Sequence, residues 1–152
     1  MATVSSDEID ILEKAKRTLD LDYVPSEDEP YMNDNQQNYF RSLLTEWKRS
    51  IHNAADQTLQ SLQDGPIREP DLNDRASSET DWGIELRTRD RQRKLISKID
   101  AALRRIDEGE YGFCEVTGDP IGLRRLVARP VATMTVEAQE AHERREKISR
   151  DD

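Results

Sequence analysis

Two long amphipathic stretches dominate the hydrophobic pattern of this chain, and a short break near its middle separates them. In the first stretch, over about residues 33–63, the seam positions recur every three or four residues, at Phe40, Leu44, Trp47, Ile51, Ala54, Thr58 and Leu62. In the second, over about residues 75–107, the same spacing runs through Ile84, Thr88, Arg91, Leu95, Ile99, Ala102 and Ile106. This near-heptad spacing predicts two long helices with one seam each. Because such a seam is not stable alone in water, each helix is expected to cover the other.

The break between the two helices predicts the tip of an antiparallel hairpin. It covers about residues 64–78 and contains Gly65-Pro66 and Glu69-Pro70, and a proline biases the residue before it away from helical conformation. Two long helices joined through such a break most simply fold back on each other. Gly109, which follows the second seam, is well placed to end that helix.

The segments on either side of the hairpin predict a small globular head. A first helix runs from Ser6 to about Leu19, and an acidic linker with two prolines follows it. Glycines and turn residues after the hairpin allow small strands or loops, and a last helix starts at about Thr135, where we expect it to pack beside the first helix. The predicted fold is mostly α, a long coiled-coil hairpin with a small head, divided into residues 1–32, 33–108, 109–134 and 135–152.

Composition narrows the class of protein. The chain has 152 residues, about one domain, and its 34% hydrophobic and 36% charged residues favour long solvated helices over a large core. The net charge of −9 argues against indiscriminate nucleic-acid binding. The sequence has no run apolar enough to cross a membrane, and its acidic N-terminal segment lacks an apolar h-region, so we expect no signal peptide there. A single cysteine excludes an internal disulfide and fits a reducing cytosol.

The charge is unevenly distributed along the chain. Residues 1–34 carry ten acidic and three basic side chains, whereas residues 82–105 carry eight basic and three acidic ones. The second helix therefore presents a local cationic face on an anionic protein. This face is either a solvated helix surface or a contact surface for a partner.

Residues 111–118 (YGFCEVTG) have the layout of a zinc knuckle, Cys-x-x-Cys-Gly, in which Thr117 replaces the second cysteine. Structural zinc needs four ligands, usually thiolates or imidazoles. Cys114 is the single thiol, and His52 and His142 are distant in the sequence. We therefore expect no zinc, and interpret Cys114 as a small buried hydrophobe or, alternatively, as a redox-reactive thiol.

The segment ELRTRDRQRKLISKIDAALRRIDEGEYGFCEVTGDPIGLRRLVARP resembles the DksA/TraR family of RNA polymerase-binding transcription factors. The resemblance implies a coiled-coil hairpin and a head with a four-cysteine zinc finger. The finger pattern of the family, C-x2-C-x17-C-x2-C, falls here on Cys114, Thr117, Thr135 and Ala138. The resemblance then implies a degenerate finger whose metal is replaced by packing of Val116, Ile121, Leu126, Val131 and Val136.

The resemblance also implies a site on the hairpin. The tip motif of the family, Asp-x-x-Asp-x-Ala, falls on Asp71, Asp74 and Ala76. It implies that the hairpin enters the secondary channel of RNA polymerase, where the tip carboxylates accept hydrogen bonds near the active site. The residues implied to contact the channel rim are Arg87, Arg89, Arg91 and Lys94.

The alarmone ppGpp is the implied co-regulator. By the family pattern its binding positions are Leu95, Lys98, Arg129 and position 139, which is usually lysine and is Gln139 here. The resemblance implies that the factor and ppGpp destabilise open promoter complexes in the stringent response, repressing ribosomal RNA promoters and activating some amino-acid biosynthesis promoters. Three arginines of the head could instead form ion pairs with acidic residues of the head. The arginines are Arg124, Arg125 and Arg129, and the acidic residues are Glu110, Glu115 and Asp119.

We therefore expect a cytoplasmic, monomeric, non-enzymatic regulator of bacterial transcription, with RNA polymerase and ppGpp as partners and no direct contact with DNA or membrane. Three alternatives stay open. Asp71 and Asp74 could hold Mg²⁺ in the polymerase active site, as in transcript-cleavage factors. The hairpin could be an adaptor that oligomerises through its seam. Cys114 could be a redox sensor.

Overall fold

The computed structural model describes residues 6–63 and 72–151, and it describes residues 6, 7, 58, 59, 61–63, 72–79 and 151 by their backbone alone. The helices in these ranges are α1 (Ser6–Leu19), α2 (Asp34–Gln63), α3 (Leu72–Glu108), α4 (Leu123–Ala128) and α5 (Val136–Asp151). Phe113 and Pro120 form an isolated antiparallel bridge, and the same ranges contain no longer strand. The predicted mostly α fold, a hairpin with a small head, is confirmed. None of these helices is both long and apolar enough to cross a membrane.

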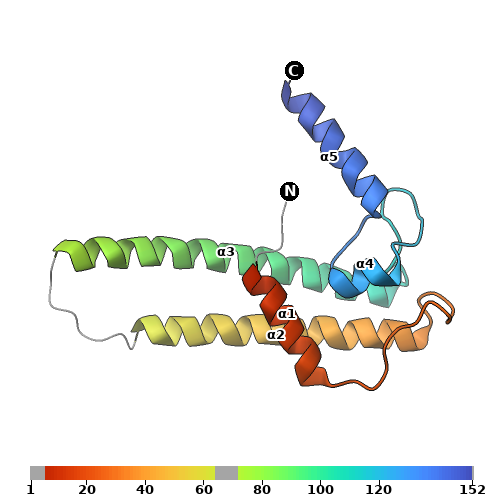
Figure 1. Ribbon diagram of the computed structural model, residues 1–152, viewed down its shortest axis with the longest axis horizontal. Coiled ribbons are helices and arrows are strands. Elements are labelled where there is room, and N and C mark those ends of the chain that lie inside the picture. Colours follow the sequence, from red (N-terminus) through yellow and green to blue (C-terminus); the bar gives the residue numbers. More distant parts are fainter. Residues whose placement is uncertain (1–5, 64–71, 152) are drawn as a thin grey trace.

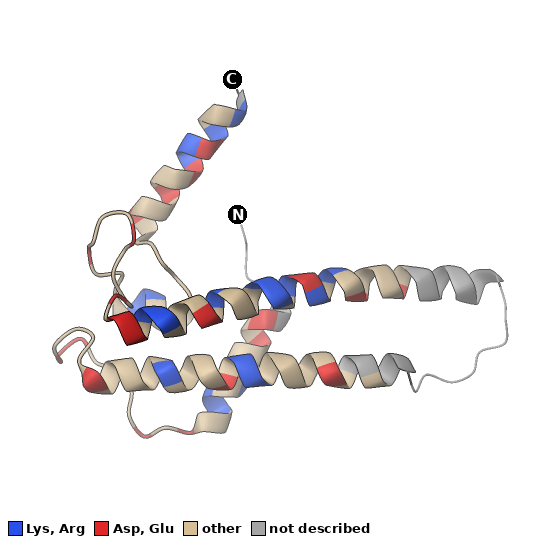
Figure 2. Ribbon diagram, turned by 180° about the vertical axis from the view of Figure 1, so that it is seen from behind, with Lys and Arg blue, Asp and Glu red and all other residues tan. Residues whose placement is uncertain are grey.

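The two longest helices form the hairpin. α2 and α3 lie side by side and run in opposite directions (Figure 1, Figure 2). Near the head their buried residues are Phe40, Leu43, Leu44, Trp47, Ile51, Leu95, Ile99, Ala102 and Ile106. Further along α3 toward the tip, Ile84 and Leu86 are 50% and 58% exposed. The seam is therefore closed from Leu95 onward and open toward the tip, where Arg91 takes a seam position and is exposed.

Local hydrogen bonds explain where α2 begins and where α3 ends. The Asn33 side chain accepts a hydrogen bond from the Gln36 N–H at 2.9 Å and so caps the start of α2. Gly109 has a φ of 74°, a left-handed conformation that glycine adopts without a steric cost. Its N–H donates to Ile106 O at 3.1 Å, and the Glu110 N–H donates to Arg105 O at 2.9 Å. These paired bonds form a Schellman motif, so the predicted helix end at Gly109 is confirmed.

The head is tied together by tyrosine hydroxyls and a close backbone contact. The Tyr31 hydroxyl donates to Gly112 O at 2.6 Å and accepts from the Gly122 N–H at 3.0 Å. Gly112 has a φ of 92°, and a Cβ added there would lie 2.8 Å from Met32 Cγ, so only glycine fits. The Tyr111 hydroxyl donates to Pro130 O at 2.7 Å. The linker before α2 and the turns after α3 are thus joined into one unit.

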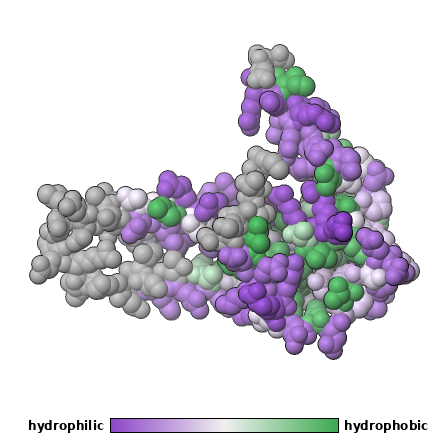
Figure 3. Space-filling model, in the orientation of Figure 1, coloured by the Kyte–Doolittle hydropathy of each residue, from purple (hydrophilic) through white to green (hydrophobic). Residues whose placement is uncertain are grey.

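Two parts of the head differ from the sequence-based expectation. A short helix, α4, occupies a region where loops or strands were expected, because six residues are too few to show a helical period. α5 does not pack beside α1 but runs away from the head, with a mostly hydrophilic surface (Figure 1, Figure 3). Its residues 144–150 are all exposed, since its sequence offers too few apolar side chains to bury.

Of the five residues expected to pack in place of a metal, three are buried and two are exposed. Ile121, Leu126 and Val131 are buried, as expected. Val116 and Val136 are 58% and 45% exposed, so the expectation is wrong for these two. Val116 lies in the knuckle turn and Val136 at the start of the outward-pointing α5. The core of the finger-like region therefore forms on the side that faces α1 and the hairpin.

Replacing Ile99 by alanine should destabilise the protein by about 2–4 kcal/mol, because Ile99 is fully buried in the α2–α3 seam. Ile84→Ala on the same helix should change the free energy of unfolding by less than about 0.5 kcal/mol, since Ile84 is half exposed. Urea denaturation followed by circular dichroism measures both values. Equal effects of the two substitutions would contradict a seam that is closed at Ile99 and open at Ile84.

Candidate functional site

The described part of the tip motif, the backbone of Asp74 and Ala76, lies at the end of α3 opposite the head. Asp71 falls outside the described residues. Asp74 and Ala76 belong to the first turns of α3, of which the structure describes the backbone alone. Since α3 has 37 residues, it extends about 55 Å at roughly 1.5 Å per residue. The backbone of Asp74 and Ala76 is thus held far from the head (Figure 1).

Four basic residues of α3 form one exposed row, which we call the basic stripe: Arg87, Arg91, Lys94 and Lys98. They are four, three and four positions apart, a spacing that places residues on one face of a helix. Figure 2 shows blue Lys and Arg segments along this part of α3. The predicted rim residues Arg87, Arg91 and Lys94 therefore lie on one face of α3, and Lys98 continues their row toward the head.

Two of the stripe residues, Arg91 and Lys94, make only weak contacts among the described residues. The Arg91 Nη2 group donates to Thr88 Oγ1 at 3.3 Å. Lys94 Nζ lies 3.1 Å from Asp90 Oδ2, and both side chains are more than half exposed. Exposed ion pairs of this kind contribute between zero and about 1 kcal/mol. Exchanging these contacts for contacts with a partner would therefore cost little.

Arg89 is separated from the other predicted rim residues. At about 100° per residue it lies roughly 160° around the helix from Arg91. Its Nε is 3.6 Å from Glu85 Oε1 one turn earlier, is buried, and makes no hydrogen bond within the described part of the chain. A partner that contacts the basic stripe would not contact Arg89 from the same side.

The four predicted ppGpp positions come from three parts of the fold. Leu95 is 5% exposed and belongs to the hydrophobic core, whereas Lys98, one turn later on α3, is exposed. Arg129 follows α4 directly, and its backbone N–H donates to Arg125 O at 2.7 Å. Gln139 lies in α5, where its side-chain amide donates to Glu143 Oε1 at 3.1 Å. Lys98 and Arg129 are thus the cationic members, and Gln139 brings a carboxylate close instead of a positive charge.

Cys114 is buried in a turn where hydrogen-bond donors converge on its sulfur. The Gly118 N–H donates to Cys114 O at 2.9 Å and closes the turn. Burial raises the pKa of the Cys114 thiol, but the Thr117 hydroxyl and the backbone N–H groups of Thr117, Thr135 and Val116 outweigh it and lower the pKa to about 7. Thr117 and Thr135 are two of the predicted ligand positions, so the structure brings three of the four positions together.

Thr135 also organises the start of α5. Its hydroxyl accepts a hydrogen bond from the N–H of Ala138, the fourth predicted ligand position, at 3.1 Å. This is the geometry of a helix cap, in which a side-chain oxygen satisfies an N–H of the first turn. Ala138 is 8% exposed. The last two positions of the finger pattern therefore act here as the cap and the first buried residue of α5.

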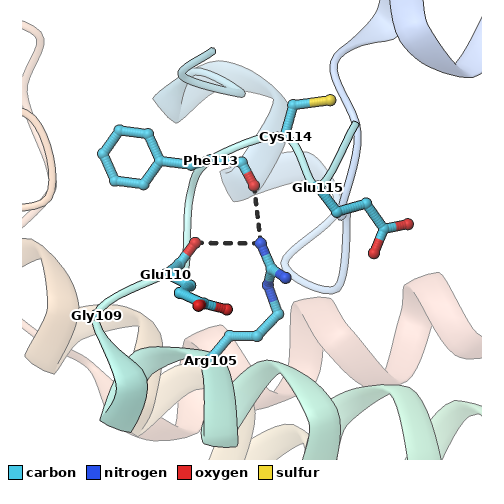
Figure 4. Close-up of a pocket in the computed structure, with 6 residues that line it drawn as sticks. All are labelled: Arg105, Gly109, Glu110, Phe113, Cys114 and Glu115. Carbon is cyan, nitrogen blue, oxygen red and sulfur yellow. Dashed lines mark hydrogen bonds between the residues drawn. The ribbon is translucent and has the colours of Figure 1, made fainter. Parts of the chain in front are cut away.

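Arg105 connects the finger-like region to α3, and sequence reasoning missed it. Its Nη2 donates to Phe113 O at 2.8 Å and to Glu110 O at 3.2 Å, as Figure 4 shows. The Cys114 sulfur points away from Arg105 in the same view, and all of these residues line a pocket of about 390 Å³. An arginine in the last turn of a helix often bonds nearby carbonyl groups, and that position was the available signal.

Comparison with known proteins finds relatives for most of the chain. Residues 36–106 match the family described as DnaK suppressor protein DksA, N-terminal domain, and residues 109–144 match the prokaryotic dksA/traR C4-type zinc finger. The RNA polymerase-binding transcription factor DksA of Caulobacter vibrioides is 63% identical over 131 residues, which cover 86% of this chain and 92% of that protein. The protein of the same name from Haemophilus influenzae is 42% identical and covers 82% of this chain, with 86% of its own length aligned.

A solved structure has the same overall arrangement. The structure of transcription factor DksA2 from Pseudomonas aeruginosa superposes on this chain with a TM-score of 0.70 and 36% sequence identity. The match covers 92% of this chain and 98% of that one. The hairpin and the head thus follow an architecture already seen in a protein of similar length.

The match to the zinc-finger family corrects one prediction. The sequence predicts no zinc in this region, and that prediction is wrong, because residues 109–144 match a family described as a C4-type zinc finger. Within residues 6–63 and 72–151, however, no three His, Cys, Asp or Glu side chains gather into a group that could hold a metal ion. Cys114, Thr117, Thr135 and Ala138 supply one thiol where a C4 site has four. These residues do not fit a four-cysteine site.

Replacing Arg105 by methionine should lower the stability of the protein by about 1–2 kcal/mol, because two carbonyl groups lose a charged donor while the apolar stem is kept. Arg104→Met is the matched control, since Arg104 is the neighbouring residue and is exposed. Thermal unfolding followed by circular dichroism compares the two variants. A control as unstable as Arg105→Met would show that general loss of charge, and not the carbonyl bonds, causes the effect.

Proposed function

We propose that this chain, which belongs to the DksA/TraR family of RNA polymerase-binding transcription factors, regulates transcription initiation by binding bacterial RNA polymerase through its α2–α3 hairpin. The expected family is thereby confirmed. The observation that carries the proposal is the combination on α3 of a motif at the far end and a basic stripe along one face. The hairpin itself performs no covalent chemistry in this proposal.

The proposed route is the secondary channel of the polymerase. Two packed helices are roughly 20 Å across, since one helix with its side chains measures about 10–12 Å. A rod of this width and about 55 Å length can enter a channel that excludes the head. Asp71 and Asp74 would then accept hydrogen bonds from basic and polar groups near the active site, and Ala76 keeps the tip narrow.

The basic stripe is proposed to bind the acidic rim of the channel. Its four cations face one way on a chain whose net charge is −9, so they concentrate positive potential on one side of the hairpin. Charges at such a rim act mainly on the rate of encounter and on orientation. The stripe would thus orient the hairpin while the tip produces the regulatory effect.

The effect on the polymerase is proposed to be a shift between conformational states. A bound factor can change the lifetime of an open promoter complex only by its different affinities for the two states. Promoters whose open complexes are intrinsically short-lived, such as those of ribosomal RNA, respond most to such a shift. Lys98 and Arg129 supply the cations for ppGpp at the interface with the polymerase, and the Gln139–Glu143 pair weakens this contribution without removing it.

Asp74→Asn should abolish the shortening of open-complex lifetime at a ribosomal RNA promoter, because it removes one charge and keeps the side-chain shape. A charge-assisted hydrogen bond contributes about 1.5–3 kcal/mol, so the loss corresponds to roughly tenfold or more in the lifetime ratio. Purified polymerase would be measured with no factor, with the wild type and with Asp74→Asn, each with and without ppGpp.

The outcomes separate the parts of the proposal. Shortening by the wild type that deepens with ppGpp and is lost in Asp74→Asn supports both the tip mechanism and the alarmone site. Shortening without any effect of ppGpp leaves polymerase binding in place and removes the alarmone from the proposal. A wild type that changes no lifetime contradicts the regulatory function and favours a hairpin adaptor, whereas transcript cleavage in backtracked complexes would favour a Mg²⁺-holding tip.

Arg91→Ala should weaken polymerase binding by about threefold to tenfold at low salt and reduce the salt dependence of binding. Arg89→Ala is the matched control, because Arg89 lies on the other side of the same helix and should change affinity by less than about twofold. Competition binding at two salt concentrations measures both. An Arg89 effect as large as that of Arg91 would mean that the polymerase surrounds the hairpin instead of contacting one stripe.

A further inference from the structure

A cavity of about 680 Å³ opens between α1 and α4, with part of α2 at its base. Its buried lining comes from Leu12 of α1, Trp47 of α2 and Leu123 of α4, which are 3%, 1% and 6% exposed. Figure 3 shows hydrophobic residues gathered on this face between α1 and α4. Cavities of this size and lining are typical of sites for small molecules, which range from about 300 to 1,000 Å³.

The mouth of the cavity carries apolar side chains that nothing in the described chain covers. Ile9 of α1 is 47% exposed and Val136 at the start of α5 is 45% exposed, and both line the cavity. Single exposed apolar residues are ordinary on a protein surface. Two of them at the mouth of one apolar cavity extend its surface outward and favour a ligand with an apolar body.

The polar groups of the cavity are mainly donors. Trp47 is 1% exposed, and its indole N–H has no hydrogen-bond acceptor among the described residues. A buried donor without an acceptor is uncommon and costs about 1–3 kcal/mol. An indole N–H can only donate, so the group that would satisfy it must be an acceptor.

Three arginines also line the cavity: Arg124, Arg125 and Arg129. Arg125 Nε donates to Met134 O at 2.9 Å, which holds its guanidinium in place. Burial and the positive charge of Arg129 lower the pKa of Arg125 from its ordinary value, while Glu137 acts in the opposite direction. Glu27 is the carboxylate in the lining, so the cationic groups outnumber it.

We propose that this cavity binds a small amphipathic anion whose apolar body contacts Leu12 and Trp47 and whose anionic head group lies against the arginines of α4. The head group, a carboxylate or a phosphate, would accept hydrogen bonds that guanidinium groups donate in pairs. The ligand would join α1 to α4 and so stiffen the head. The basic stripe and the tip do not line this cavity, so its test does not depend on the proposed contact of the hairpin with polymerase, and Arg129 is the one residue that it shares with the proposed ppGpp site.

The probe for the test is 1-anilinonaphthalene-8-sulfonate, which combines an apolar ring system with one anionic group. The chain has two tryptophans, so the Trp82→Phe background leaves Trp47 as the reporter inside the cavity. Binding is followed by quenching of Trp47 fluorescence and by probe emission. Circular dichroism and a urea melt of each variant confirm that the fold is kept, since partly unfolded proteins also bind this probe.

Two variants change the lining of the cavity, and a third, outside the cavity, is the control. Ala128→Phe fills it from an exposed position of α4, and should weaken probe binding by about tenfold or more. Arg124→Gln removes an exposed cation of the mouth, and should weaken binding by about threefold to tenfold. Arg144→Gln on the exposed part of α5 removes the same charge elsewhere and should leave binding unchanged.

Competition defines the ligand class. Decanoate and decyl phosphate should both displace the probe, decanol should do so at least about tenfold less well, and inorganic phosphate should not displace it. A preference between the first two identifies the head group. Probe binding that Ala128→Phe leaves unchanged, or displacement by decanol as strong as by decanoate, would overturn the proposal. An effect of Arg144→Gln equal to that of Arg124→Gln would overturn it as well, because net charge would then explain the binding.

Discussion

The apolar seam between α2 and α3 is the interaction on which the other features of this protein depend. Phe40, Leu44 and Ile51 are fully buried there, opposite Ile99 and its neighbours on α3. Neither helix could bury these side chains alone, and a helix of this length gains most of its stability from packing. The pairing anchors the part of α3 from Leu95 onward, and the rest of this single helix extends from that part, with the backbone of Asp74 and Ala76 far from the head.

The finger-like region depends on contacts with the rest of the molecule. Arg105 reaches it from the last turn of α3, and Tyr31 reaches it from the linker before α2. Inside the region, Thr117 and Thr135 direct their donors at Cys114. These hydrogen bonds bring the turn after Cys114 and the start of α5 together.

For contact with a partner, the side of the helix on which each charge lies matters more than the number of charges. α3 carries its basic residues on two opposite sides, and only the stripe that contains Arg91 and Lys98 is a continuous exposed row. Arg89, on the other side, is occupied by Glu85. The cavity between α1 and α4 follows the same principle, because Arg124 and Arg125 of α4 and the adjacent Arg129 all line it, against a single carboxylate, Glu27.

The sequence by itself determined the two hairpin helices, their seam and the helix end at Gly109, because hydrophobic period and turn chemistry are local properties of the chain. The separation of Arg89 from Arg91 was also present in the spacing, since helical phase follows from residue number. Only the tertiary structure decided the short helix α4, the outward course of α5, the carbonyl bonds of Arg105 and the cavity beside Trp47. The cavity brings together residues that are distant in the sequence, and no local pattern records which distant surfaces will meet. α4 is too short to show a helical period, and the Arg105 bonds, although they span only five and eight residues, depend on how the turn after α3 folds back.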